Sequence, residues 1–351
     1  MSFLDFFRVV YRLLADIASW RRLLQRKLEG RGCPILRLPV DLIFRISNQL
    51  DPASLHTFSQ TCCSLRVILG THSRAENFSL EDRWEYLAAI ARDIPDHWVC
   101  EACCTLHPVC ELDTPHEPSL KSCPLSWRRW RHAGYGQQQR LDNRLFRVDH
   151  RHIQLALKYT RLQIDEFQDY LRSLLAPHIN DKFETFTFPH KRPNVLAVHY
   201  SVIPKIVRDH VGNYRYLMLS TWRYHPDLEP VTIMAMGELR ICPHLILHPG
   251  RNGPSNMQSG SLREIIGTTM AKRQDGVQMT FGYCRYCPTD FCVVAYPDHV
   301  VLGAWQDMGT EGSPMDVSWR VHVFNPGKLA RSRKQLIHEP GSVRQLYHKK
   351  G

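Results

Sequence analysis

The chain has 351 residues, of which 43% are hydrophobic and 23% charged, and its formal net charge is +11. These values are ordinary for a globular protein of one or two domains, and they exclude a low-complexity or fibrous chain. The positive charge is dispersed along the sequence, so it permits an acidic partner or nucleic acid without indicating either.

The twelve cysteines occur without a secretory signal pattern. We therefore expect free thiols or metal ligands in a reducing compartment rather than a disulfide framework. No uncharged apolar run approaches the ~20 residues that a membrane-spanning helix needs. A cytoplasmic or nuclear location follows as an expectation.

Residues 2–28 predict one amphipathic helix, and a short polar linker follows it, so that 1–32 form the first segment. The helix admits three interpretations: it packs on the rest of the protein, lies on a membrane surface, or is an organelle transit peptide. Two aspartates count against the transit peptide. Arg8 and Arg12 interrupt the apolar core that a secretory signal requires.

Residues 33–71 predict two or three short, tightly joined helices. Pro39 stands near the first turn of the first helix, where its missing N–H has no cost. Asp51 and Pro52 stop one helix and start the next, whose apolar side chains share one helical face. A segment this short cannot bury all its apolar surface internally, so some should contact another surface. The recurring apolar residues are Leu42, Ile43, Ile46 and Leu50, then Leu55, Phe58, Cys62, Leu65 and Leu69.

This arrangement resembles the F-box, a module that docks on the Skp-type adaptor of an SCF-type cullin–RING ubiquitin ligase. An ordinary helical hairpin would explain the apolar stripes, but not the joint placement of Pro39, Pro52 and Arg66. The resemblance is carried by Leu38-Pro39, Leu42, Ile43, Ile46, Leu50, Asp51, Ser54-Leu55, Thr61-Cys62, Leu65-Arg66 and Leu69. It implies apolar adaptor anchors at Leu38, Pro39, Leu42, Ile43, Ile46, Leu50, Leu55 and Leu65.

Residues 72–110 predict a helix followed by a cysteine-containing loop. Ser79 and Asp82 have the spacing of a capping arrangement at the helix start. Cys100 and Cys103 have the spacing of a zinc knuckle, and His107 follows four residues later. Two reduced core cysteines are the alternative interpretation.

The stretch from Glu85 to Cys103, with Leu106-His107-Pro108 after it, resembles a segment of filamentous-fungal F-box proteins. In those proteins the F-box is followed by a helix and a Cys-x2-Cys element. The resemblance narrows the family but implies no particular substrate.

Residues 111–180 predict a connector of loop and helix, with short amphipathic helices at 150–162 and 165–175. The segment Trp127–His132 places aromatic residues among basic ones. It is either a patch for nucleic acid or phosphate, or a partly buried edge with arginine stacked on tryptophan.

From about residue 181 the hydrophobic period changes to two, which predicts a β-rich domain over 181–326. One helix, 262–272, interrupts the strands. The fold class is therefore α+β: an N-terminal helical F-box module, a helical segment, and a mainly antiparallel β-rich domain stapled by zinc. The expected strands include 195–207, 214–224, 277–283, 290–296, 300–305 and 317–324.

The β-rich region carries further candidate metal ligands, because Cys242 and His244 precede a second Cys-x2-Cys pair, Cys284 and Cys287. These four residue types suit one structural zinc ion. An alternative site joins the two Cys-x2-Cys pairs as four thiolates, and the sequence does not choose between them. The candidate ligands are Cys100, Cys103, His107, Cys242, His244, Cys284 and Cys287.

The basic tail, 327–351, predicts a solvated end, and no catalytic motif is evident along the chain. The interpretation favoured by these patterns is a non-catalytic substrate-recognition subunit of a ubiquitin ligase, with a Skp-type adaptor and an unknown protein substrate as partners. The alternatives are a zinc-stabilised protein- or nucleic-acid-binding module outside a ligase, and a hydrolase with an open metal position.

Overall fold

The computed structural model describes residues 34–70, 78–117, 123, 148–180, 196–226, 230–247, 259–323 and 335–349. The chain divides into two compact units, Met1–Asp82 and Arg83–Gly351. Among the described residues, no helix is both long and apolar enough to cross a bilayer. The amphipathic helix predicted at 2–28 lies outside the described residues.

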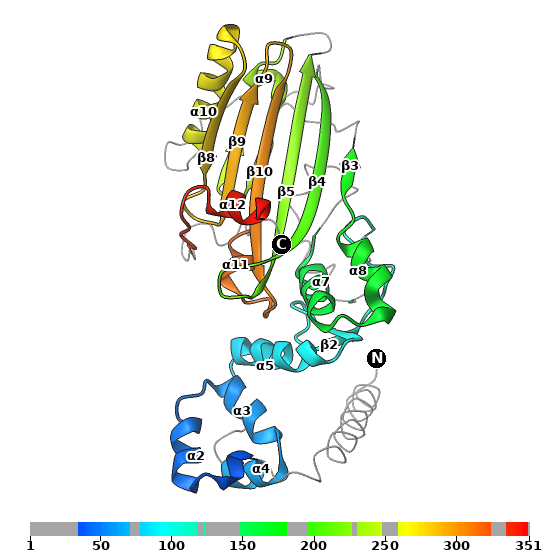
Figure 1. The fold of residues 1–351 in the computed structure, drawn as a ribbon, viewed down its shortest axis with the longest axis vertical. Coiled ribbons are helices and arrows are strands. Elements are labelled where there is room, and N and C mark those ends of the chain that lie inside the picture. The colour runs from blue at the N-terminus through cyan, green and yellow to red at the C-terminus, as the bar shows by residue number, and fades with distance from the viewer. Residues whose placement is uncertain are drawn as a thin grey trace. The chain divides into compact units, whose positions relative to one another are not determined.

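The first unit consists of short helices whose ends are specified by local side chains (Figure 1). Asp51 precedes the Pro52 that begins α3, and its Oδ1 accepts the N–H of Ser54 at 2.9 Å. This cap confirms the predicted turn and satisfies a donor that helix geometry leaves free. The elements are the 3-10 helix η1 (Pro34–Arg37), α2 (Val40–Ser47), α3 (Pro52–Gln60) and α4 (Cys63–Leu69).

The apolar face predicted for a single second helix is divided between α3 and α4. The break falls at Thr61, whose hydroxyl donates to the carbonyl of Phe58 at 2.8 Å. Ile43, Leu65 and Leu69 converge from α2 and α4, and these fully buried side chains form the core of the unit.

The helix α5 (Leu80–Asp93) has the predicted capping arrangement. The N–H of Asp82 donates to Ser79 Oγ at 3.0 Å, and the N–H of Ser79 donates to Asp82 Oδ2 at 3.1 Å. The second unit continues with the small hairpin β1 (His97–Val99) and β2 (Leu106–Pro108), then α7 (His150–Leu162), η5 (Asp165–Phe167) and α8 (Gln168–Leu174).

One antiparallel sheet of six strands dominates the second unit, in the order β3-β4-β5-β10-β9-β8 (Figure 1). Five expected strands agree with β4, β5, β8, β9 and β10. This agreement confirms the predicted fold class of helices followed by a mainly antiparallel β-rich region. The strands are β3 (His178–Asn180), β4 (Leu196–Arg208), β5 (Tyr214–Pro226), β8 (Gln278–Tyr283), β9 (Thr289–Ala295) and β10 (Val300–Thr310).

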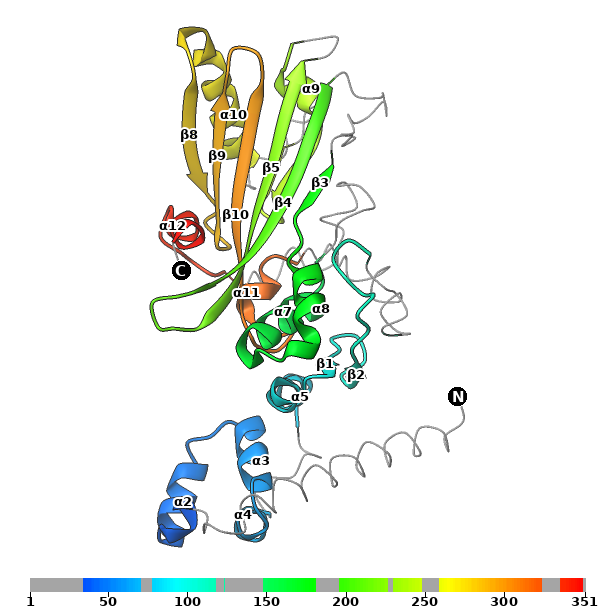
Figure 2. The same cartoon turned by 45° about the vertical axis from the view of Figure 1, so that its right-hand side comes forward.

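The two faces of this sheet are covered by different helices (Figure 2). Side chains such as Trp222 and Phe291 face the main core, to which α10 contributes Leu262 and Ile266. On the opposite face, Trp305 and its neighbours lie against α12. The helices of this region are α9 (Ile233–Met236), α10 (Ser259–Ala271), η6 (Lys272–Asp275), α11 (Val317–Arg320) and α12 (Ser342–His348).

The basic tail, expected to be solvated, contains a packed helix, so this prediction is wrong for residues 335–349. The buried carboxylate of Asp290 on β9 accepts the N–H groups of Gly341 and Arg344, both at 2.9 Å, at the start of α12. The hydroxyl of Tyr347 donates to the carbonyl of Ile203 at 3.1 Å. These partners are distant in sequence, and the local pattern could not indicate them.

The strand expected at 317–324 is also wrong over its described residues: 317–320 form the short helix α11, and 321–323 form a turn and a bend. Asp316 Oδ1 accepts the N–H of Ser318 at 2.7 Å, and this cap starts a helical turn despite the alternating apolar pattern. The sequence pattern also missed α9 and the hairpin of β6 (Leu239–Cys242) and β7 (Leu245–Leu247).

Gly282 on β8 permits close packing, because an added Cβ would lie 2.2 Å from the ring of Phe291. We expect Gly282→Ala to lower the free energy of unfolding by about 1–3 kcal/mol, as overpacking does elsewhere. In Gly267→Ala the nearest atom is Ile233 Cδ1 at 3.4 Å, and α10 gains helix propensity, so that variant should be neutral or more stable. Urea unfolding measures both, and equal effects would contradict the packing argument.

The cap by Asp290 predicts a pH dependence. Burial raises the pKa of Asp290, but hydrogen bonds from His338 and from two backbone N–H groups outweigh burial and lower the pKa below its usual value. The ionised carboxylate therefore stabilises the fold above its unfolded pKa, and that stabilisation is lost as pH falls through the lowered pKa. Asp290→Asn should cost about 1–3 kcal/mol at neutral pH.

As pH falls below ~4 the difference in unfolding free energy between the unmodified chain and Asp290→Asn should shrink, because the carboxyl protonates first in the unfolded state, and the loss is complete below the lowered pKa of the folded state. The exposed carboxylate of Asp298 provides the control, since Asp298→Asn should change stability little. A stability difference for Asp290→Asn that does not change with pH would argue against the cap.

Candidate adaptor surface and metal-binding clusters

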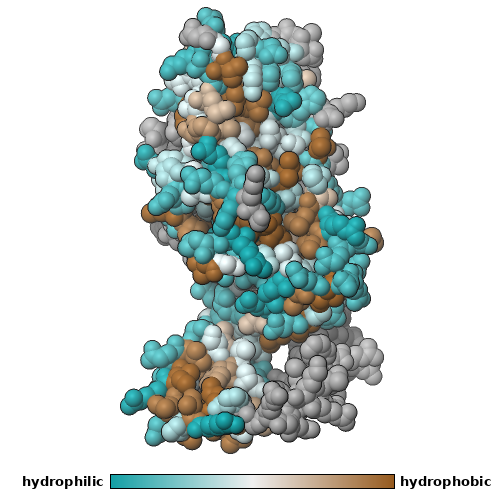
Figure 3. Space-filling model, in the orientation of Figure 1, coloured by the Kyte–Doolittle hydropathy of each residue, from teal (hydrophilic) through white to brown (hydrophobic). Residues whose placement is uncertain are grey.

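The first unit presents a set of apolar side chains that its own core does not bury. Leu38, Leu42 and Ile46 are 38%, 41% and 38% exposed. Leu36 and Val40 belong to the same short segment and are 37% and 49% exposed. Figure 3 shows apolar side chains gathered on the α2 side of this unit. We call these five residues the α2 surface.

The remaining predicted anchors divide into two groups. Pro39 is exposed, and Leu50 and Leu55 are half-buried, so all three remain accessible to a partner. Ile43 and Leu65 have no exposed area and fill the core of the unit. Their assignment as surface anchors is corrected: they support the helices that carry the α2 surface.

In the second unit, one cluster joins Cys242, His244, Cys284 and Cys287. Their ligand atoms all lie within 4.8 Å of one another, the three cysteines are buried and the histidine is half-buried. The pairs come from two hairpins, the β6–β7 turn and the connection between β8 and β9. We call this the β6–β8 cluster, and it could hold a metal ion.

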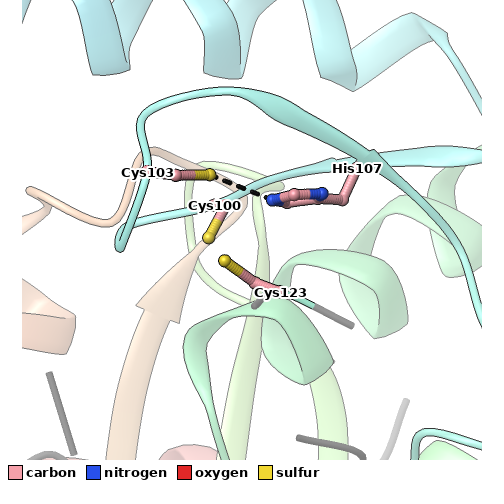
Figure 4. A group of neighbouring side chains, drawn as sticks. All are labelled: Cys100, Cys103, His107 and Cys123. Atoms are coloured by element: carbon pink, nitrogen blue, oxygen red, sulfur yellow. Dashed lines mark hydrogen bonds between the residues drawn. The ribbon is translucent and has the colours of Figure 1, made fainter. Parts of the chain in front are cut away.

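A separate cluster joins Cys100, Cys103 and His107 to a fourth residue, Cys123 (Figure 4). The side chains point toward a common centre, and Cys103 Sγ lies 3.0 Å from His107 Nε2. The β1–β2 hairpin supplies three of the groups, Cys100 and Cys103 from its loop and His107 from β2. We call this the β1–β2 cluster.

Sequence reasoning missed Cys123 because no second cysteine stands near it at metal-ligand spacing. It is nevertheless buried, with 1% exposure. The structure also separates the two Cys-x2-Cys pairs into different clusters, so the described residues do not support the alternative site of four thiolates.

Three contacts recur in the two Cys-x2-Cys turns. Each turn also has its own threonine, two residues after the second cysteine, which the sequence analysis did not single out. In the β1–β2 cluster, the N–H of Cys100 donates to the carbonyl of Thr105 at 2.9 Å, and the N–H of Ala102 donates to Cys100 Sγ at 3.3 Å. The hydroxyl of Thr105 lies 2.9 Å from Cys103 Sγ.

The β6–β8 cluster repeats each contact. The N–H of Cys284 donates to the carbonyl of Thr289 at 2.8 Å, and the N–H of Tyr286 donates to Cys284 Sγ at 3.4 Å. Thr289 Oγ1 lies 3.2 Å from Cys287 Sγ. The sequence signal common to both turns is therefore Cys-x2-Cys-x-Thr. In this turn the two sulfurs belong to one cluster, and a backbone N–H and a threonine hydroxyl lie within hydrogen-bond distance of them.

The electrostatics of the β1–β2 cluster favour a cation at its centre. Hydrogen bonds from the Cys100 and Cys123 thiols lower the pKa of Cys103. Burial lowers the pKa of His107, but contact with Cys103 and Cys123 outweighs it and raises that pKa to about 9. A metal ion at the centre would displace the protons of these groups, because thiols and imidazole bind metal in their deprotonated forms.

Helix α7 holds the segment that leads into this cluster. The buried Nζ of Lys158 donates to the carbonyls of Ile94 and His97 at 2.9 and 2.5 Å. Gln154 Oε1 accepts the N–H of Val99, the residue before the first ligand, at 3.0 Å. The backbone that presents Cys100 is therefore fixed by side chains of a buried helix.

Comparison with known families supports the F-box resemblance of the first unit. Residues 35–75 match the family model of the F-box domain. No curated protein and no solved structure matches the chain. The chain therefore contains an F-box domain that includes the α2 surface, whereas the second unit has no counterpart in those comparisons. The basic segment Trp127–His132 lies outside the described residues.

Proposed function

We propose that this protein is the substrate-recognition subunit of an SCF-type cullin–RING ubiquitin ligase. The observation that carries the proposal is the coincidence of the F-box match at 35–75 with the exposed apolar α2 surface. F-box domains bind Skp-type adaptors and serve as adaptors for substrates rather than as catalysts. The ubiquitin transfer itself belongs to other subunits of the ligase.

The α2 surface has the chemistry that adaptor docking needs. Small soluble units rarely leave several large apolar side chains exposed together unless a partner covers them. Leu38 and Pro39 precede α2, while Leu42 and Ile46 lie one helical turn apart on it. Burying these anchors in a partner would supply the binding free energy, with the core residues beneath keeping them in place.

The second unit would hold the protein substrate, which remains unidentified. We further propose that both clusters bind structural zinc. Three thiolates and one imidazole form a donor set that zinc prefers, in a closed site with four protein ligands. The likeness of residues 85–108 to filamentous-fungal F-box proteins stays a prediction.

Adaptor docking is tested by changing Leu38 and Pro39 together to alanine. We expect the double variant to lose binding to a recombinant Skp-type adaptor by at least about tenfold, because two central anchors are removed. Val67→Ala is the matched control, since Val67 is an apolar residue of the same unit that is 85% exposed and outside the predicted anchors. Retained binding by the double variant in a pull-down would refute the assignment.

Zinc binding is tested by elemental analysis of the purified chain. We expect two zinc ions per chain, one fewer in Cys123→Ser, and one fewer in Cys284→Ser. Cys110→Ser should retain both, since Cys110 is exposed and belongs to neither cluster. Loss of zinc should also lower the stability of the second unit, because ligand binding contributes to folding free energy. Two ions in the Cys123→Ser variant would remove that residue from the site.

A further inference from the structure

The strand β8 is an edge strand of the six-stranded sheet. Among the described residues it pairs with β9 and with no other strand. In an antiparallel pair, alternate residues direct their N–H and C=O groups away from the partner. Within the described part of the chain, the far side of β8 therefore offers a row of backbone groups to which a further strand could bond.

Natural edge strands are normally protected by charged side chains, proline, a bulge or short length. The six residues of β8 include no charged residue and no proline, and its pairing with β9 is regular throughout. Its outward side chains are apolar and exposed: Met279 by 57% and Phe281 by 51%. Val277, just before the strand, is 57% exposed.

This row belongs to a larger apolar area on the same face. Val294 on β9 pairs with Met279, and Val301 on β10 pairs with Val294, so the three side chains form one row across three strands. Figure 3 shows apolar side chains gathered on the upper part of this face. Helix α12 covers the lower part, around Trp305.

Basic residues stand before the strand, after it and against one of its side chains. Lys272 and Arg285 are exposed before and after it. The guanidinium of Arg344, on α12, lies 3.9 Å from the centroid of the Phe281 ring. A chain segment bound along β8 would therefore meet an apolar centre with cations at its ends, which favours an apolar core flanked by acidic residues.

We propose that β8 binds an extended segment of the protein substrate as an additional strand. The segment has alternating apolar side chains that pack on Met279 and Phe281, and acidic residues near Lys272, Arg285 or Arg344. Its backbone pairs with the open edge of β8, and its side chains provide the selectivity. This inference rests on the proposed function, because it names the surface and the class of segment by which the receptor would hold its substrate.

The metal cluster would fix one end of this edge. β8 ends at Tyr283, and the next residue is Cys284 of the β6–β8 cluster. The N–H of Cys284 donates to the carbonyl of Thr289, and this hydrogen bond holds the end of β8 in register with β9. A metal ion bound to Cys284 would hold it further. An edge held rigidly at its end loses less conformational freedom when a peptide pairs with it.

The test uses a phage-displayed library of random twelve-residue peptides, selected on the zinc-loaded full-length chain. We expect enriched peptides to alternate apolar residues and to carry acidic flanks. A synthetic peptide of the enriched sequence should bind Phe281→Asp and Met279→Asp at least about tenfold more weakly than the unmodified chain. Methylating alternate backbone nitrogens of the peptide should weaken it similarly, because methylation removes the strand hydrogen bonds.

Val211→Asp is the matched control, since Val211 is 71% exposed in the β4–β5 turn and should leave peptide affinity unchanged. No enrichment, or peptide binding that Phe281→Asp does not alter, would overturn the proposal. Light scattering that shows a dimer broken by Phe281→Asp would also overturn it, because a second copy would then occupy the edge.

Adaptor binding separates this proposal from the proposed function. The Phe281→Asp chain should bind the Skp-type adaptor as the unmodified chain does, and the Leu38/Pro39 double alanine variant should bind the peptide normally. A chain that binds the adaptor but captures no peptide would show that only the β8 proposal has failed. Absence of adaptor binding in a chain that captures the peptide would instead count against the ligase assignment.

Discussion

The two short hairpins of the second unit are each tied to a Cys-x2-Cys-x-Thr turn, and the three contacts described for one turn recur in the other. β1, β2, β6 and β7 have only three or four residues each, too few for isolated hairpins to be stable in water. Each turn places two sulfurs beside a histidine and a third cysteine from a distant part of the chain. A bound cation would therefore join short elements that packing alone holds weakly.

The first unit is limited by its size, because it has few residues with which to build a core. Ile43, Leu65 and Leu69 are completely buried, while five apolar neighbours around α2 remain exposed. This division follows from size, because a unit this small cannot enclose all its apolar side chains. Three of the side chains left outside, Leu38, Leu42 and Ile46, are among the predicted adaptor anchors.

Local signals explain what the sequence predicted well. The caps by Asp51 and by Ser79 with Asp82 join residues three positions apart, and five strands are rich in β-branched and aromatic residues, with more buried and more exposed positions alternating in β4 and β8. The failures involve partners far apart in the chain. Asp290 accepts N–H groups at the start of α12, about fifty residues further along the chain. Cys123 joins a cluster whose other members lie at 100–107. The burial of Ile43 and Leu65 likewise depends on how α2 and α4 meet.

We propose that this F-box engages a Skp-type adaptor while the second unit remains available for substrate. Calorimetric titration of the zinc-loaded full-length chain with a recombinant Skp-type adaptor tests it most directly. We expect one adaptor per chain, with a negative heat-capacity change from burial of the apolar α2 surface. A folded, zinc-loaded chain that gives no binding heat at any temperature, and no complex by light scattering, would contradict it.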